Sequence, residues 1–179
     1  NERRLAGHAT PLASIAIVDD APEEQFLFAE FLMFQRLFEL HGIRAVIADP
    51  QSLSFRAGRL WHEDIAIDLV YNRLTDFYLE GRACSALREA FEHDAVVLTP
   101  HPRAHALYAD KRNLELLSDA ARLQDLGVPA SMRELLVENV PRTIVVKASD
   151  AERLWSERRS LFFKPVAGFG SRQGPSNRF

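Results

Sequence analysis

Short runs that are almost uninterrupted in apolar residues restrict most how this chain can fold. The runs are residues 14–19, 43–48, 65–71 and 95–99. A run that is apolar at successive positions indicates a strand buried on both faces, as in parallel sheets. Helical patterns lie between the runs, at residues 22–41 and 80–92; Pro22 suits a helix start and Gly42 suits a helix stop. The alternation predicts an α/β domain with a mostly parallel sheet.

Polar residues follow several of these predicted strands directly. Asp19 and Asp20 follow the first run, and Asn72 and Arg73 follow the third. Ligands of parallel sheets bind beyond the carboxyl ends of the strands. Because arginine recognises carboxylates through paired hydrogen bonds, we predict a substrate-binding role for Asn72 and Arg73, with a surface salt bridge as the alternative. For Asp19 and Asp20 a turn is favoured over a substrate contact.

Composition excludes several classes of protein. The 179 residues carry a formal net charge of -3, without the basic excess of nucleic-acid-binding proteins. The most apolar stretch, residues 26–40, contains charged residues and is shorter than the ~20 residues of a membrane span. The only cysteine, Cys84, cannot form an intrachain disulfide, so a cytoplasmic location is expected. Cys84 lies among Ala and Leu, which indicates a buried thiol rather than a nucleophile.

Two further patterns leave alternatives open. The predicted helix at residues 22–41 is rich in phenylalanine and apolar on more than one face, so it is either packed inside the core or part of a homodimer interface. Core packing is preferred, and a homodimer stays open. His101 and His105 have the i, i+4 spacing of a zinc pair, but no third ligand is evident, so no metal site is predicted.

The pattern changes near residue 102, which we take as a domain boundary between residues 1–102 and 103–179. Helices are predicted for residues 103–126, closed by Gly127, and for residues 151–159. Residues 128–141 are expected to form a connection. Apolar strands are predicted at residues 143–146 and 161–164, and the second is followed by a loop over residues 165–170.

That last loop has the residue types of a phosphate site. Lys164 ends the predicted strand, and Gly168 and Gly170 follow it. Glycines let backbone amides approach an anion closely, and a lysine supplies a positive charge. No Gly-Lys-Ser/Thr sequence follows the glycines, so this is not a Walker A loop. A simple turn between two strands is the alternative interpretation.

A second lysine, Lys111, gives the pattern its specificity. Together with the Lys164 loop, its surroundings resemble the ATP-grasp superfamily. The resemblance is carried by Asp110-Lys111, Leu117-Ser118-Asp119, Val140-Pro-Arg-Thr143 and Phe163-Lys-Pro-Val-Ala-Gly-Phe-Gly170. The first domain resembles the pre-ATP-grasp domain of the glutathione synthetase-like branch. The resemblance implies a parallel-sheet pre-ATP-grasp α/β domain followed by the beginning of an ATP-grasp central α+β subdomain.

The resemblance also implies roles for particular residues. Lys111 would contact phosphate oxygens of ATP, and Lys164 would reach the α-phosphate and the adenine edge. The segment containing Gly168, Phe169, Gly170 and Ser171 would close over the β- and γ-phosphates. Such enzymes are ATP-dependent carboxylate-amine or carboxylate-thiol ligases, in which Mg2+-ATP phosphorylates a small-molecule carboxylate and an amine-type acceptor attacks the acyl phosphate.

The chain departs from the family after this loop. The family continues into an apolar strand, whereas the residues after Ser171 are polar and include Pro175. The family's Mg2+ ligands lie farther downstream, so we expect them outside this chain. The central subdomain is therefore expected to be truncated, and this chain alone is expected to be inactive. The alternatives are a non-catalytic nucleotide-binding or structural α/β module, and an unrelated α/β domain.

Overall fold

The computed structural model describes residues 11–167 of the chain. The chain divides into two compact units, the first ending at His105 and the second beginning at Ala106. We describe each unit by itself. Across residues 11–167, no helix combines the length and the apolar character needed to cross a membrane.

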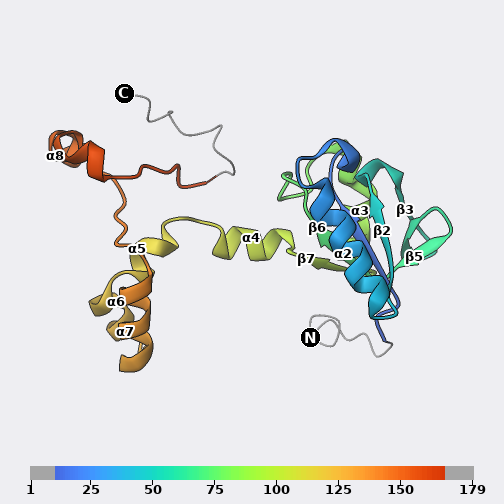
Figure 1. The fold of residues 1–179 in the computed structure, drawn as a ribbon, viewed down its shortest axis with the longest axis horizontal. Helices are drawn as coiled ribbons and strands as arrows, with labels where there is room; N and C mark the ends of the chain where they lie inside the picture. The colour runs from blue at the N-terminus through green and yellow to red at the C-terminus, as the bar shows by residue number, and fades with distance from the viewer. Residues whose placement is uncertain (1–10, 168–179) are drawn as a thin grey trace. The chain divides into compact units, whose positions relative to one another are not determined.

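A parallel sheet forms the centre of the first unit (Figure 1). Its strands are β1 (Ser14–Val18), β2 (Arg44–Ala48), β6 (Leu69–Asn72) and β7 (Val97–Thr99), in the order β2-β1-β6-β7. All neighbouring strands run parallel, and every residue of β1 is buried. The α/β class predicted from the uninterrupted apolar runs is confirmed.

Helices cover both faces of this sheet. The 3-10 turn η1 (Pro22–Glu24) and helix α2 (Phe28–Leu40) follow β1, and α2 lies against β1 and β2. Phe31 of α2 is fully buried. Just after the helix, Gly42 has a positive φ of 74°, which glycine adopts without strain. On the opposite face, η3 (Arg82–Cys84) leads into α3 (Ser85–Glu92), which packs on the core.

A second, antiparallel sheet follows β2 in the chain, and the sequence pattern did not predict it. After the turn η2 (Pro50–Ser52), its strands are β3 (Leu53–Arg56), β4 (Arg59–His62) and β5 (Ile65–Ile67). Ala57 and Gly58, with φ of 50° and 69°, join β3 to β4. Positive φ at both residues of a two-residue loop matches the right-handed twist of a hairpin. Gly58 was the signal for this turn.

The third apolar run, predicted as one strand, is divided between the two sheets at Asp68. Its first part, β5, pairs with β4, and its second part, β6, pairs with β1. The backbone N–H of Asp68 donates to Ser14 Oγ (2.9 Å), and its carboxylate accepts from Ala13 N at 2.9 Å and Ser14 N at 3.2 Å. The Asp68 side chain thus fastens the strand break to the start of β1.

In the described residues of the second unit, helices and 3-10 turns are the only regular secondary structure. Helix α4 (Pro102–Tyr108) crosses the division between the units. It is followed by α5 (Asn113–Leu117), α6 (Ala120–Asp125), α7 (Ala130–Asn139), η4 (Ala148–Asp150), α8 (Ala151–Glu157) and η5 (Arg158–Ser160). Gly127, with φ of 76°, ends α6 as expected. Helix α7 occupies residues that were predicted as a connection.

The strands predicted at residues 143–146 and 161–164 are absent from the structure of the described residues. A strand needs a neighbouring strand to receive its N–H and C=O groups. Neither segment pairs with another strand in the part of the chain that is described. Burial nonetheless alternates along the first segment as it would in a strand, because Thr143 and Val145 are half-buried and Ile144 and Val146 are exposed.

Candidate functional site

Lys111 and the segment after Lys164 meet in the second unit. Lys111 lies in the turn between α4 and α5, and Lys164 lies in the irregular segment after η5. The backbone N–H of Lys111 donates to the carbonyl oxygen of Val166 at 3.2 Å. This bond joins parts of the chain that are far apart in sequence, and it brings the backbone on which Lys164 lies beside Lys111.

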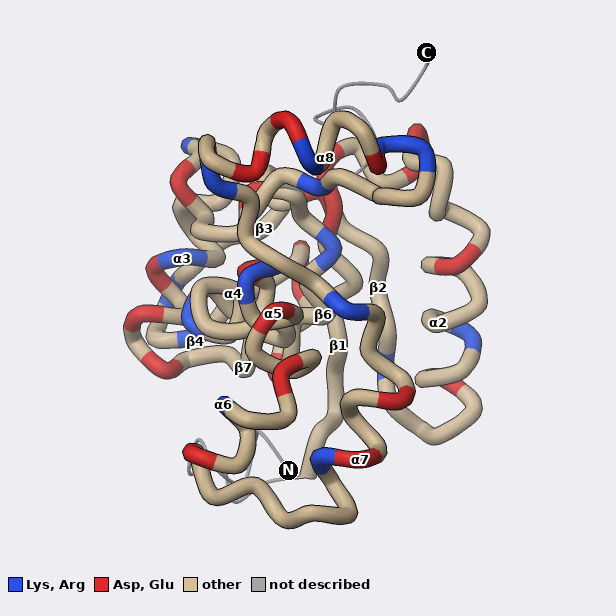
Figure 2. Tube along the Cα trace, turned by 90° about the vertical axis from the view of Figure 1, so that its left-hand side faces the viewer, with Lys and Arg blue, Asp and Glu red and all other residues tan. Residues whose placement is uncertain are grey.

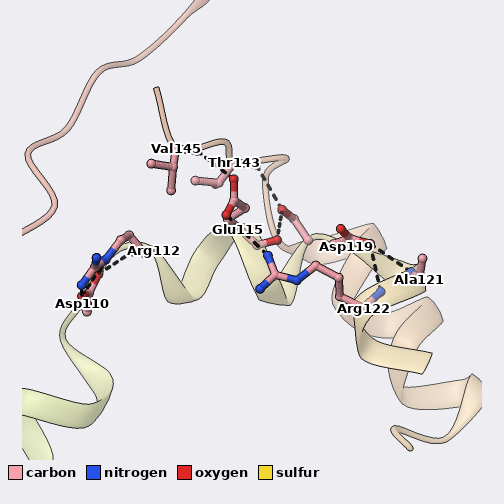
Figure 3. Close-up of polar contacts among 9 residues, drawn as sticks. Asp110, Arg112, Glu115, Asp119, Ala121, Arg122, Thr143 and Val145 are labelled. Carbon is pink, nitrogen blue, oxygen red and sulfur yellow. Dashed lines mark hydrogen bonds and ion pairs between the residues drawn. The ribbon is translucent and has the colours of Figure 1, made fainter. Parts of the chain in front are cut away.

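The turn around Lys111 is fixed by an acid–base pair. The carboxylate of Asp110 accepts from Arg112 N at 2.8 Å and from Arg112 Nε at 3.0 Å, and it forms an ion pair with the same guanidinium (Figure 3). These hydrogen bonds from Arg112 hold the pKa of Asp110 below its ordinary value of 3.8. Because the guanidinium of Arg112 pairs with the carboxylate of Asp110, the charges of these two residues largely neutralise each other.

Glu115 of α5 links this turn to the segment at residues 143–146. Its Oε1 accepts from the backbone N–H of Val145 at 2.9 Å, and its Oε2 lies 3.5 Å from Arg122 NH1 (Figure 3). The Glu115 side chain is one-third exposed (33%). A carboxylate therefore supplies the acceptor that a neighbouring strand would have supplied.

Ser118 adds a second contact of the same kind. Its Oγ accepts from Thr143 N at 3.1 Å and donates to the carbonyl of Glu115 at 3.2 Å. The next residue, Asp119, caps α6 by accepting from Ala121 N at 3.0 Å and Arg122 N at 3.1 Å (Figure 3). The amides of alternate residues, Thr143 and Val145, are thus held by side chains of α5 and the residue after it.

Lys164 is an exposed residue whose Nζ lies 5.3 Å from the ring centroid of Phe162. Such a cation–π contact at an exposed position is weak, about 0.5–1 kcal/mol, and leaves the ammonium group able to turn toward a ligand. The residues predicted to close over the phosphates, Gly168, Phe169, Gly170 and Ser171, lie outside the described residues.

The predicted substrate residues of the first unit are engaged in holding their own strand end. Asn72 is buried; its Nδ2 donates to the carbonyl of Pro100 at 3.1 Å and its Oδ1 accepts from Leu74 N at 3.1 Å. Arg73 forms an ion pair with Glu30 of α2 at 3.2 Å and donates to Tyr71 OH at 3.1 Å. A substrate role for the pair stays a prediction.

Aspartates gather at the carboxyl end of the parallel sheet. Burial raises the pKa of Asp19 above 3.8, and burial together with the charges of Asp49 and Asp76 raises that of Asp20. Asp76 behaves oppositely: burial acts to raise its pKa, but hydrogen bonds from Gly81 N, Glu80 N and other donors outweigh burial and lower it. Over residues 11–167, no three His, Cys, Asp or Glu side chains are grouped to hold a metal ion.

The predicted histidine pair, His101 and His105, and Cys84 lie against apolar groups. His105 stacks on Phe77 with ring centroids 3.8 Å apart, and His101 stacks on Phe91 at 5.7 Å. Cys84 lies in η3, just before α3; it is buried, and burial raises the pKa of its thiol to about 12. A thiol with that pKa carries almost no thiolate at neutral pH, so Cys84 is a poor nucleophile.

Sequence reasoning missed Glu115 at this site, and it named Ser118 only within the Leu117-Ser118-Asp119 segment, without a role. The signal for Glu115 was a single acid within an apolar helical turn, Asn113-Leu-Glu-Leu-Leu117, which begins two residues after Lys111. A lone carboxylate on a helix face that is otherwise apolar needs a partner. In comparisons with known proteins, the chain matches no family model and no curated protein.

Proposed function

We propose that the second unit binds ATP through Lys111 and Lys164, as part of an ATP-dependent carboxylate ligase of the ATP-grasp type. The observation that carries the proposal is the hydrogen bond from Lys111 N to Val166 O at 3.2 Å. It supports the proposal because it joins the turn that carries Lys111 to the segment that carries Lys164, and a shared polyphosphate site needs the two segments close together.

Each part of this chain has a defined task in the proposal. Lys111 and Lys164 neutralise phosphate oxygens, and the glycine-containing segment at residues 168–171 supplies backbone amides to them. ATP supplies the phosphoryl group that activates a small-molecule carboxylate, and an amine-type or thiol acceptor completes the ligation. Asn72 and Arg73 are the residues of the first unit that we assign to the carboxylate, because guanidinium and amide groups both donate to carboxylate oxygens.

Magnesium enters the proposal only outside the described residues. Mg2+ prefers carboxylate and water oxygens in an octahedral arrangement. Among residues 11–167, no group of three or more His, Cys, Asp or Glu side chains is placed to hold a metal ion. We therefore assign no step to Mg2+ here and expect catalysis to need further residues. A cytoplasmic location is part of the same proposal, based on the single cysteine.

The test is an isothermal calorimetric titration of the folded chain with ATP, in the presence and in the absence of Mg2+. Lys164→Ala and Lys111→Ala should each weaken ATP binding by about 10–100-fold, because a charge-assisted contact contributes about 1.5–3 kcal/mol. Lys147→Ala is the matched control, since Lys147 is an exposed lysine in the same unit and has no assigned role. Its affinity for ATP should change by less than about threefold.

Three results separate the alternatives. If the folded chain does not bind ATP at all, the nucleotide proposal fails. If Lys147→Ala weakens binding as much as Lys164→Ala, the effect is one of general charge and the assigned site is wrong. If ATP binds as proposed but the longest natural form of the protein releases no ADP with panels of carboxylates, amines and thiols, the chain is a non-catalytic nucleotide-binding module.

A further inference from the structure

Helix α2 exposes a stripe of large apolar side chains on the face that points away from the sheet. Phe26, in the turn just before α2, is 99% exposed; Met33 is 73% exposed and Leu40 is 68% exposed. Leu32 and Leu37 are exposed as well. The helix appears mostly tan in Figure 2, because few charged residues interrupt it. Phe31 is the only fully buried residue of α2, whereas Phe28, Phe34 and Phe38 are half-buried. Core packing, the preferred alternative, therefore accounts for Phe31 but not for the exposed stripe.

The stripe is symmetric about Met33. Ala29 and Leu37 lie four residues before and after Met33, and Phe26 and Leu40 lie seven residues before and after it. Residues four and seven apart lie on one face of a helix. A two-fold axis through Met33 therefore places Met33 opposite itself, Ala29 opposite Leu37 of a second copy, and Phe26 opposite Leu40. A small side chain then faces a large one, as close packing of helices requires.

We propose that α2 forms an antiparallel homodimer interface with α2 of a second copy of this chain, centred on Met33. The size of the face supports a second copy. Its exposed side chains leave on the order of 600 Å2 of apolar surface in water, at the upper end for a monomer. Two such faces reach about 1,200 Å2, where interfaces of standard size begin. This inference does not depend on ATP binding.

Sedimentation equilibrium of the full chain tests the interface. The wild-type chain should form a dimer of twice 20.3 kDa, and Met33→Glu should weaken dimerisation by about a hundredfold or more, because two like charges would meet at the axis. The chain's other methionine provides a matched control. Met132 lies on α7 and is 48% exposed, so Met132→Glu adds the same charge elsewhere and should leave the dimer unchanged.

A cross-linking experiment tests the symmetry itself. With residue 33 opposite its own copy, Met33→Cys should form a covalent dimer on mild oxidation, whereas Met132→Cys should not. Native Cys84 does not interfere, because it is buried and its pKa is raised to about 12. Circular dichroism checks that each variant is folded. A wild-type chain that stays monomeric at all concentrations, a dimer that survives Met33→Glu, or equal loss with Met132→Glu would each overturn the proposal.

Discussion

Removing the carboxylate of Glu115 is the sharpest test of how the candidate site is held together. In Glu115→Ala, the backbone N–H of Val145 loses its acceptor at 2.9 Å, and Arg122 loses its ion-pair partner at 3.5 Å. Neither lost contact is replaced by a strand, because residues 143–146 pair with no strand in the described chain. The segment should therefore open more often, while α6, which is capped separately by Asp119, stays folded.

The magnitude follows from the exposure of the two partners. A hydrogen bond to a charged group contributes about 1.5–3 kcal/mol, and water at a side chain that is 33% exposed reduces this to about 1–2 kcal/mol. The ion pair adds about 0–1 kcal/mol, because Arg122 is 54% exposed. We expect the opening free energy at Val145 to fall by about 1–3 kcal/mol, so its amide should exchange roughly 5–150 times faster.

Amide hydrogen exchange followed by NMR measures this opening at single residues. Glu115→Gln keeps an acceptor oxygen but loses the charge, so it should accelerate exchange at Val145 less than Glu115→Ala does. Arg122→Ala removes only the ion pair and should change exchange by less than about fivefold. The amide of Leu123, bonded within the first turn of α6 to Asp119 O at 3.0 Å, is the internal reference. Unchanged exchange at Val145 in Glu115→Ala would refute the assigned role.

Three further predictions concern the first unit. Burial gives Asp19 a folded-state pKa above 3.8, so the folded protein favours the protonated side chain and becomes less stable as the pH rises through that range. Asp19→Asn should therefore raise the free energy of unfolding at pH 7. Urea titrations should show that this gain shrinks below pH 4. Asp76, whose net pKa shift is downward, contributes stability above pH 3.8 that is lost on acidification, so Asp76→Asn should destabilise at pH 7 and the difference should again shrink in acid. Ser14→Ala should lower the free energy of unfolding, measured by heat or urea, by about 1–3 kcal/mol. The reason is that Ser14 Oγ donates to Ala66 O at 2.6 Å and accepts from Asp68 N at 2.9 Å in a part-buried site. The control Ser54→Ala, on the exposed side of β3, should lower it by less than about 0.5 kcal/mol.

The parallel sheet was predictable because its signal is local and strong. A strand that is buried on both faces must be apolar at successive positions, and β1, with every residue buried, shows this pattern most clearly. The division of the third run into β5 and β6 was not predictable in the same way. It depends on Asp68 receiving the amides of Ala13 and Ser14, which come from the start of a different strand. Periodicity within a run contains no information about such a distant partner.

The two lysines of the candidate site could be named from the sequence, but the contacts that hold their segments in place could not. The order of Lys111 and Lys164 along the chain could be read from residue types alone. Their supports could not, because an apolar run at residues 143–146 predicts only an extended segment and not what accepts its hydrogen bonds. A carboxylate and a hydroxyl, from Glu115 and Ser118, took the place of a neighbouring strand.

Helix α5 is therefore the element on which the candidate site depends. A helix of only five residues, Asn113–Leu117, is unstable by itself, because forming one turn costs more conformational entropy than its few hydrogen bonds return. It persists because contacts from distant segments hold it: Val166 O accepts from Lys111 N just before the helix, and Glu115 within it binds Val145 N. The same contacts fix the backbone positions of both lysine-bearing segments. Stability of α5 and the arrangement of the proposed phosphate-binding lysines are thus one property of the unit, and a change that loosens one should loosen the other.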